Sequence, residues 1–205
     1  MKNKRFWIID NGHGGFIDGK PVTPGKRSPV WKDKAMDQLI EGDFNRKVVR
    51  VLAGLLHSEG IQYQILVTEE RDVSLADRVR RVGRICRKHP NAVLVSIHAN
   101  AGGGKGFEVF TSVGETESDK IATIFCEQYK KDLPDFPLRV DRADGDPDKE
   151  SNLYILRKTA CPAILTENLF MDNKEECKFL LSKEGVAQIA AIHAQAIAKY
   201  ERGLK

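Results

Sequence analysis

Short apolar runs alternate with longer stretches of helical periodicity along this chain, and this alternation most restricts the folds that it can adopt. Short apolar runs are typical of buried strands, whereas apolar residues three and four positions apart are typical of amphipathic helices. The expected strands are residues 6–10, 63–67, 92–97, 107–111 and 163–166. Strands separated by helices predict an α/β fold with a mostly parallel or mixed twisted sheet, covered by helices on both faces.

The stretches between these runs have helical spacing or no period at all. Helices are expected over residues 42–59, 75–88, 116–131, 175–181 and 185–200. Residues 14–37 and 132–150 are polar, contain several Gly and Pro and have no period, so we expect loops there, and long ordered loops are often functional. A length of 205 residues without internal repeats suits one compact domain, expected over residues 1–205.

The composition excludes several classes of protein. With 41% hydrophobic and 30% charged residues, the chain resembles ordinary globular proteins. The net charge is +4, and the densest basic stretch, residues 78–84, follows a helical period. A solvated helix face explains that stretch better than a nucleic-acid patch does, so no nucleic-acid partner is expected. No apolar run approaches the length of a membrane span, so membrane insertion is not expected either.

The N-terminus and the cysteines indicate a reducing compartment. Residues 1–5 are basic, but the apolar run 6–9 is too short for the core of a signal peptide, so we expect synthesis in the cytoplasm without a secretion signal. No two cysteines form a CxxC pair, and each lies in an apolar or amphipathic context. We therefore expect free thiols rather than disulfides or zinc ligands at Cys86, Cys126, Cys161 and Cys177.

Two histidines follow strand-like runs directly. His13 lies among glycines after the first run, and His98 follows residues 92–97. The carboxyl ends of strands in open α/β sheets form the crevice where ligands bind, and imidazole is the commonest neutral metal ligand. Each histidine alone fits a turn or a buried, backbone-bonded position equally well. Three further histidines are expected on helix surfaces or ends, without a ligand role: His57, His89 and His193.

Two glutamates could complete a site with His13 and His98. Glu41 stands at the start of a helical stretch, where a carboxylate also favours the helix N-terminus for purely structural reasons. Glu167 ends the run 163–166, and an ionised glutamate is seldom buried without a partner. Burial should raise the pKa of Glu167 and a nearby cation should lower it, which suits a general base. Two histidines and one carboxylate, with a spare carboxylate beside them, are the components of a hydrolytic zinc site.

An ordered set of motifs covers the chain from about residue 6 to residue 200. The motifs are DNGHGG, EGDFN, RDVSLADRV, VSIHANA, GFEVF, NLYILRKTACPAILTEN and a terminal AIAKY. Their order resembles that of zinc-dependent N-acetylmuramoyl-L-alanine amidases of the Amidase_3 type. The resemblance implies one Zn²⁺ ion bound by His13, Glu41 and His98, with Glu167 as the catalytic residue. Asn100 and Arg71 are weaker candidates for contacts with the substrate, and Arg71 alternatively forms only a salt bridge.

The same resemblance implies a function in the cell wall. The expected reaction is hydrolysis of the amide bond between the lactyl group of N-acetylmuramic acid and L-alanine of peptidoglycan. A wall hydrolase made in the cytoplasm needs a route outward, so a phage endolysin is one hypothesis, and a bacterial amidase is the other. The alternatives in chemistry are a zinc peptidase acting on stem peptides and a non-catalytic peptidoglycan-binding module. One departure from the family pattern, Glu-Asn-Leu-Phe at residues 167–170 in place of Glu-Thr-Gly-Phe, predicts altered contacts beside Glu167.

Overall fold

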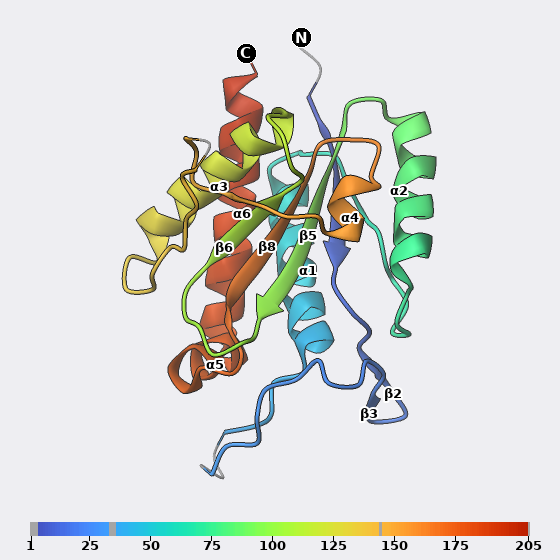
Figure 1. Cartoon of the computed structure of the whole chain (residues 1–205). Coiled ribbons are helices and arrows are strands. Elements are labelled where there is room, and N and C mark those ends of the chain that lie inside the picture. The colour runs from blue at the N-terminus through green and yellow to red at the C-terminus, as the bar shows by residue number, and fades with distance from the viewer. Residues whose placement is uncertain (1–3, 33–35, 144, 205) are drawn as a thin grey trace.

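A six-stranded sheet forms the centre of the structure, a computed structural model that describes residues 4–32, 36–143 and 145–204 (Figure 1). The strands lie in the order β4-β1-β5-β8-β6-β7. Their bounds are β1 (Phe6–Asn11), β4 (Tyr63–Ile65), β5 (Ala92–Asn100), β6 (Glu108–Thr111), β7 (Lys149–Glu150) and β8 (Ala163–Phe170).

The pairing is mostly parallel. Strands β4, β1, β5 and β8 run in one direction, whereas β6 is antiparallel to β8 and β7 is parallel to β6. This confirms the expected mixed, mostly parallel sheet. Because β1, β5 and β8 are parallel neighbours, the residues at their carboxyl ends meet at one edge of the sheet.

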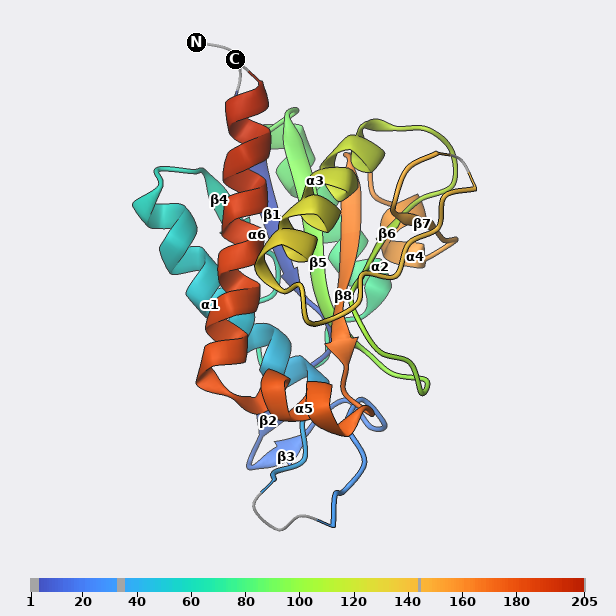
Figure 2. The ribbon, with the colours of Figure 1, turned by 90° about the vertical axis from the view of Figure 1, so that its left-hand side faces the viewer.

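Helices cover both faces of the sheet, as predicted (Figures 1 and 2). One face and the larger part of the core are covered by α1 (Glu41–Ser58), α3 (Glu117–Asp132), α5 (Lys174–Leu181) and α6 (Lys183–Gly203). The other face is covered by α2 (Leu75–Lys88) and the single turn α4 (Tyr154–Arg157). The alternation of apolar and polar residues in each helix explains this arrangement, because each helix buries only its apolar side.

Polar side chains define where several helices begin. The Ser74 hydroxyl accepts a hydrogen bond from the Asp77 backbone N–H at the start of α2. Thr116 and Asp119 form a reciprocal capping box at the start of α3. Such caps satisfy backbone N–H groups that have no partner within the helix. Each helix expected from periodicity begins and ends within a few residues of the observed helix.

Two strands are longer than expected, which changes the setting of two candidate residues. β5 continues to Asn100 and β8 continues to Phe170, so His98 and Glu167 lie inside strands rather than just beyond them. The two residues are opposite each other in the β5–β8 register. The pairing continues because backbone groups of both strands find partners across the ladder, although a register shift follows between His98 and Asn100.

The first expected loop, residues 14–37, contains a small hairpin. It is formed by β2 (Phe16–Ile17) and β3 (Lys20–Pro21). Residues 33–35 of that loop, and residues 1–3 of the basic N-terminus, lie outside the described residues. The turn α4 was not expected, because one helical turn is too short to show a period. Within the described ranges, no helix combines the length and apolarity needed to cross a bilayer.

Two expectations about exposure were wrong. Arg78, part of the basic stretch expected on a solvated helix face, is only 2% exposed. His193, expected at a helix surface, is fully buried, and its ring contacts the Thr166 hydroxyl at 3.0 Å and the Ile189 carbonyl oxygen at 2.8 Å. Arg78 contacts β1, and His193 contacts Thr166 of β8 as well as its own helix, and a helical period does not reveal such distant partners. The four cysteines are free thiols in the structure, and Cys126 and Cys177 are buried.

Candidate metal centre and catalytic pocket

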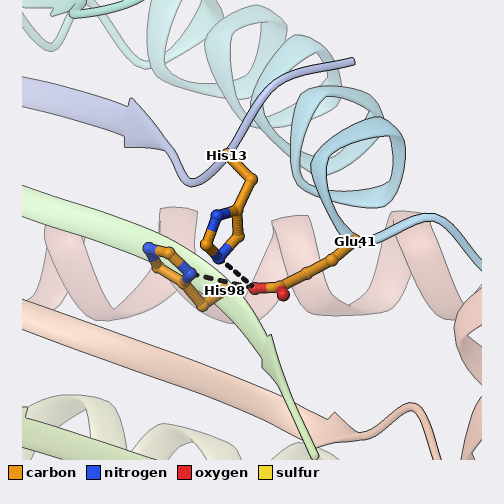
Figure 3. Close-up of side chains that lie close together, drawn as sticks. All are labelled: His13, Glu41 and His98. Atoms are coloured by element: carbon orange, nitrogen blue, oxygen red, sulfur yellow. Dashed lines mark hydrogen bonds and ion pairs between the residues drawn. The ribbon is translucent and has the colours of Figure 1, made fainter. Parts of the chain in front are cut away.

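Three side chains from separate elements converge at the carboxyl edge of the sheet (Figure 3). His13 follows β1, Glu41 is the first residue of α1, and His98 lies in β5. The Glu41 Oε1 atom is 2.9 Å from Nδ1 of His98 and 3.3 Å from Nε2 of His13. One ligand atom from each residue lies within 4.8 Å of the other two. Two imidazole nitrogens and one carboxylate oxygen at this spacing suit a tetrahedral zinc ion with a position left open.

The electrostatics of this cluster favour a bound cation. Burial opposes ionisation of Glu41, but hydrogen bonds with His13 and His98 lower its pKa well below the usual range. Burial likewise opposes the charged form of His98, but its contact with Glu41 raises the His98 pKa. Glu41 is 2% exposed, so its charge must be balanced locally, by a proton on an imidazole or by a metal ion.

Close backbone approaches explain why His13 lies among glycines. A Cβ atom on Gly12 would lie 2.1 Å from the His98 ring, and one on Gly42 would lie 1.8 Å from the Gly14 carbonyl oxygen. His13 itself has a φ of 62°, a left-handed conformation that costs a non-glycine residue free energy and is found mainly at functional sites. The glycines thus allow β1, β5 and the start of α1 to come close enough for the three ligands to meet.

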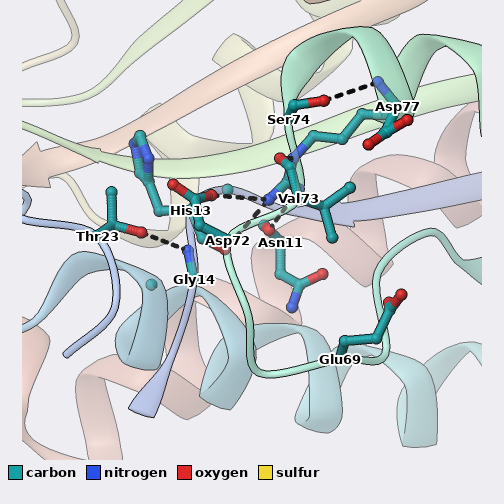
Figure 4. A network of polar contacts seen from close by, with 12 residues as sticks. Asn11, His13, Gly14, Thr23, Glu69, Asp72, Val73, Ser74 and Asp77 are labelled. Carbon is teal, nitrogen blue, oxygen red and sulfur yellow. Dashed lines mark hydrogen bonds and ion pairs between the residues drawn. The ribbon is translucent and has the colours of Figure 1, made fainter. Parts of the chain in front are cut away.

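Two buried arginines hold the backbone of His13 in this conformation. Arg78 forms an ion pair with Asp10 and donates hydrogen bonds to the carbonyl oxygens of Asn11 at 2.9 Å and His13 at 3.1 Å. Arg46 donates a second hydrogen bond to the His13 carbonyl oxygen, at 3.0 Å. Figure 4 shows His13 and Asn11 within this polar network. Outer contacts of this kind orient metal ligands, because they fix the direction of the side chain.

The Glu167 side chain lies beside this cluster and forms no hydrogen bond with the residues that the structure describes. Its Oε2 atom is buried and unpaired among the described residues. Burial raises the pKa of Glu167 to about 7, with repulsion from Glu41 and Glu108 adding to the rise and His98 opposing it. A carboxylate with a pKa near neutrality that is not already hydrogen-bonded is suited to accept and return a proton.

A pocket of about 360 Å³ lies beside Glu167 and the two histidines of the cluster. Glu167, His98 and His13 line one part of it. Leu75 at the start of α2 and Tyr154 at the start of α4 line another part, and they are 51% and 37% exposed. The pocket thus combines polar reactive groups with apolar walls, as ligand sites commonly do.

Comparison with known proteins identifies the family. A family model described as N-acetylmuramoyl-L-alanine amidase, Amidase_3, matches residues 8–199. The chain belongs to this family. The expected resemblance is confirmed, and the match covers all of the residues that form the cluster and pocket.

Relatives of this amidase domain come from a phage and from bacteria. The endolysin of Bacillus phage SPP1 is 32% identical over 96% of the chain, and the amidase CwlM of Bacillus licheniformis is 31% identical over 94%. The chain spans about two thirds of these relatives, 66% and 67% of their lengths. A crystal structure of an N-acetylmuramoyl-L-alanine amidase from Clostridium difficile 630 matches with a TM-score of 0.77 and 26% identity, over 97% of each chain.

The two weaker candidates of the amidase site lie apart from the pocket lining. The Asn100 side-chain amide donates to Glu108 at 2.6 Å, and its oxygen accepts from the Ala101 N–H. Arg71 is at the surface, 3.5 Å from Glu69. Contact of either residue with substrate stays a prediction.

Sequence reasoning missed the residues that support the candidate metal ligands. Arg46 and Arg78 lie within or directly after motifs that the family resemblance already used, EGDFN and RDVSLADRV. Spacing alone did not show that they are buried. Leu169, at the position where the family pattern has glycine, has a φ of 66° and is fully buried. The preceding Asn168 donates a hydrogen bond to the His98 carbonyl oxygen at 2.8 Å. The residues that depart from the family pattern thus take part in the contact between β5 and β8.

Proposed function

We propose that this domain is a zinc-dependent amidase that cleaves the bond between the lactyl group of N-acetylmuramic acid and L-alanine in peptidoglycan. The observation that carries the proposal is the position of Glu167, which lies opposite His98 and lines one pocket with both imidazoles of the cluster. Its Oε2 atom has no hydrogen-bond partner among the described residues. Family membership supports the bond and the substrate class.

The residues of the cluster and of the pocket would have different roles in the reaction. His13, Glu41 and His98 would hold one zinc ion, which supplies Lewis-acid polarisation and activation of water when bound. Glu167 accepts the proton of the attacking water and then passes it to the nitrogen of the leaving L-alanine. Leu75 and Tyr154 offer an apolar wall against which the substrate lies during these proton transfers.

Digestion of purified peptidoglycan tests this proposal. Zinc-loaded protein should release stem peptides that begin with L-alanine, identified by mass spectrometry, and EDTA should abolish the release. Glu167→Gln should keep zinc and lose activity by about a hundredfold or more, because it removes the general base. Trimmed stems with intact lactyl links would instead indicate a zinc peptidase, and binding of peptidoglycan without any release would indicate a non-catalytic module.

We also propose that the domain acts on the cell wall after leaving the cytoplasm, as a phage endolysin. The similarity to the SPP1 endolysin supports this, although bacterial amidases match at comparable identity. Expression in a bacterium with and without membrane permeabilisation distinguishes a phage endolysin from a bacterial amidase. Lysis only after permeabilisation is expected for an endolysin, and lysis without it would contradict this proposal.

A further inference from the structure

A second group of carboxylates lies outside the candidate zinc site. Asp119 is in the first turn of α3, and Asp146 and Asp148 precede β7. One oxygen atom from each of the three lies within 4.8 Å of the other two. These residues come from segments well separated in the sequence, so the fold itself brings their negative charges together.

Asp148 is the most buried residue of this group. The residue is 2% exposed, and its Oδ2 atom accepts a hydrogen bond from the Thr111 hydroxyl at 2.6 Å. Its Oδ1 atom is buried and has no hydrogen-bond partner within the described part of the chain. The Oδ1 atom of Asp119 is buried and unpaired in the same way. A buried carboxylate oxygen without a partner is costly, so a shared proton or a bound cation must compensate this group.

Among residues 4–32, 36–143 and 145–204, no Lys, Arg or His forms an ion pair with any of these three aspartates. Burial, together with the adjoining Asp146, raises the pKa of Asp148 to about 7. Two explanations fit this uncompensated negative charge: the carboxylates share a proton, or they bind a cation together.

The donor set decides which cation would fit. All three ligands are hard carboxylate oxygens, which favour calcium, magnesium or manganese over zinc. Calcium–oxygen distances of about 2.3–2.6 Å place two ligands of one ion up to about 5 Å apart, so the observed spacing suits it. Magnesium keeps several of its waters and prefers fewer protein carboxylates, which makes calcium the better match.

We propose that Asp119, Asp146 and Asp148 form a calcium site that fastens residues 145–148 to the start of α3 and the end of β6. The proposal is independent of the amidase reaction. Its connection to the catalytic pocket is structural, since the next residue, Lys149, contacts Glu108 at 2.6 Å, and Glu108 is opposite Glu167 in the β6–β8 register. Calcium would therefore stabilise the segment that presents Lys149 to the strand beside the catalytic glutamate.

Thermal unfolding of the zinc-loaded protein at constant ionic strength tests the site. Addition of CaCl2 to about a hundred times its Kd should raise the Tm by about 5–10 °C. Isothermal titration should give one calcium ion per chain, and MgCl2 should act more weakly. Because unfolding is measured rather than hydrolysis, failure of the amidase proposal would leave this result unaffected.

Matched variants separate a bound ion from general screening. Asp148→Asn should lose the calcium-dependent rise, as should Asp146→Asn, whose partly exposed position makes it the safer variant for folding. Asp135→Asn, at an exposed position earlier in the same connection, should keep the rise. Without calcium, Asp148→Asn should unfold at the same temperature as the parent protein or higher, because it removes one of the repelling charges. Absence of any calcium effect, or an effect that survives in both cluster variants, would overturn the proposal and leave the shared proton as the explanation.

Discussion

At the residue scale, Glu167 shows how the surroundings of one carboxyl group prepare it for chemistry. Its pKa of about 7 in the absence of metal comes chiefly from burial, and a cation held by His13, Glu41 and His98 would lower it. The same burial has a measurable effect on stability. An acid with a raised pKa in the folded state keeps its proton more tightly than it does in the unfolded chain.

Replacement of Glu167 by Gln should therefore change how stability depends on pH. In metal-free protein, Glu167 should lower the stability of the wild type as pH rises from about 4.5, its ordinary pKa, to about 7, and Glu167→Gln should lack this one contribution. The difference in free energy of unfolding between the two should change with pH in favour of the variant, by at most about 3 kcal/mol between pH 4.5 and pH 8. Thermal melts in EDTA measure this. Glu115→Gln, which removes an exposed charge, is the control, and a pH-independent difference for Glu167→Gln would contradict the prediction.

At the scale of elements, the site depends on how β1 is held against α2. Arg78 of α2 forms an ion pair with Asp10 of β1. Its guanidinium also donates hydrogen bonds to the carbonyl oxygens of Asn11, the last residue of β1, and of His13. A further hydrogen bond runs from its Nε to the Val73 carbonyl oxygen at 2.9 Å. A planar guanidinium can serve these acceptors at once, whereas a single ammonium group cannot. The helix therefore supports His13, the first of the candidate metal ligands.

Arg78→Lys should weaken both stability and metal binding. Loss of hydrogen bonds to buried carbonyl oxygens and weaker pairing with Asp10 should lower the free energy of unfolding by roughly 2–4 kcal/mol. Looser positioning of His13 should lower zinc affinity about 10- to 100-fold. Denaturant titration and competition with a chromophoric chelator measure these two effects. Arg84→Lys, at an exposed position on the same helix, should change stability by less than about 0.5 kcal/mol, and equal behaviour of the two variants would refute the role given to Arg78.

At the scale of the whole molecule, the candidate zinc ligands join three parts of the chain. They come from the loop after β1, the start of α1 and the interior of β5. A metal ion bound to all three stabilises the folded state, because the unfolded chain does not bring these ligands together. Protons compete for the same atoms, since contact with Glu41 raises the pKa of His98.

Zinc should therefore raise the Tm in a pH-dependent way. At pH 7.5, saturation to about a hundred times the Kd should raise the Tm by about 5–10 °C relative to metal-free protein, and the rise should be much smaller at pH 5.5. Scanning calorimetry at the two pH values measures it. Glu41→Gln should lose most of the zinc effect and keep the calcium effect. Equal zinc effects at both pH values would argue against histidine ligands.

The sequence by itself determined the fold class, the order of the elements and the candidate ligands. Apolar periodicity is a local signal, so it revealed the longer helices and strands but not the short elements α4, β2, β3 and β7. The motifs identified His13, Glu41, His98 and Glu167 as candidates without any structure. A local signal carries no information on partners that are distant in the chain. Only the tertiary structure decided that β6 is antiparallel, that Glu167 lies opposite His98, and that Arg78 is buried under His13. The same holds for the aspartates: each is an ordinary polar residue in sequence, and they become a site only because folding brings α3 and the segment before β7 together.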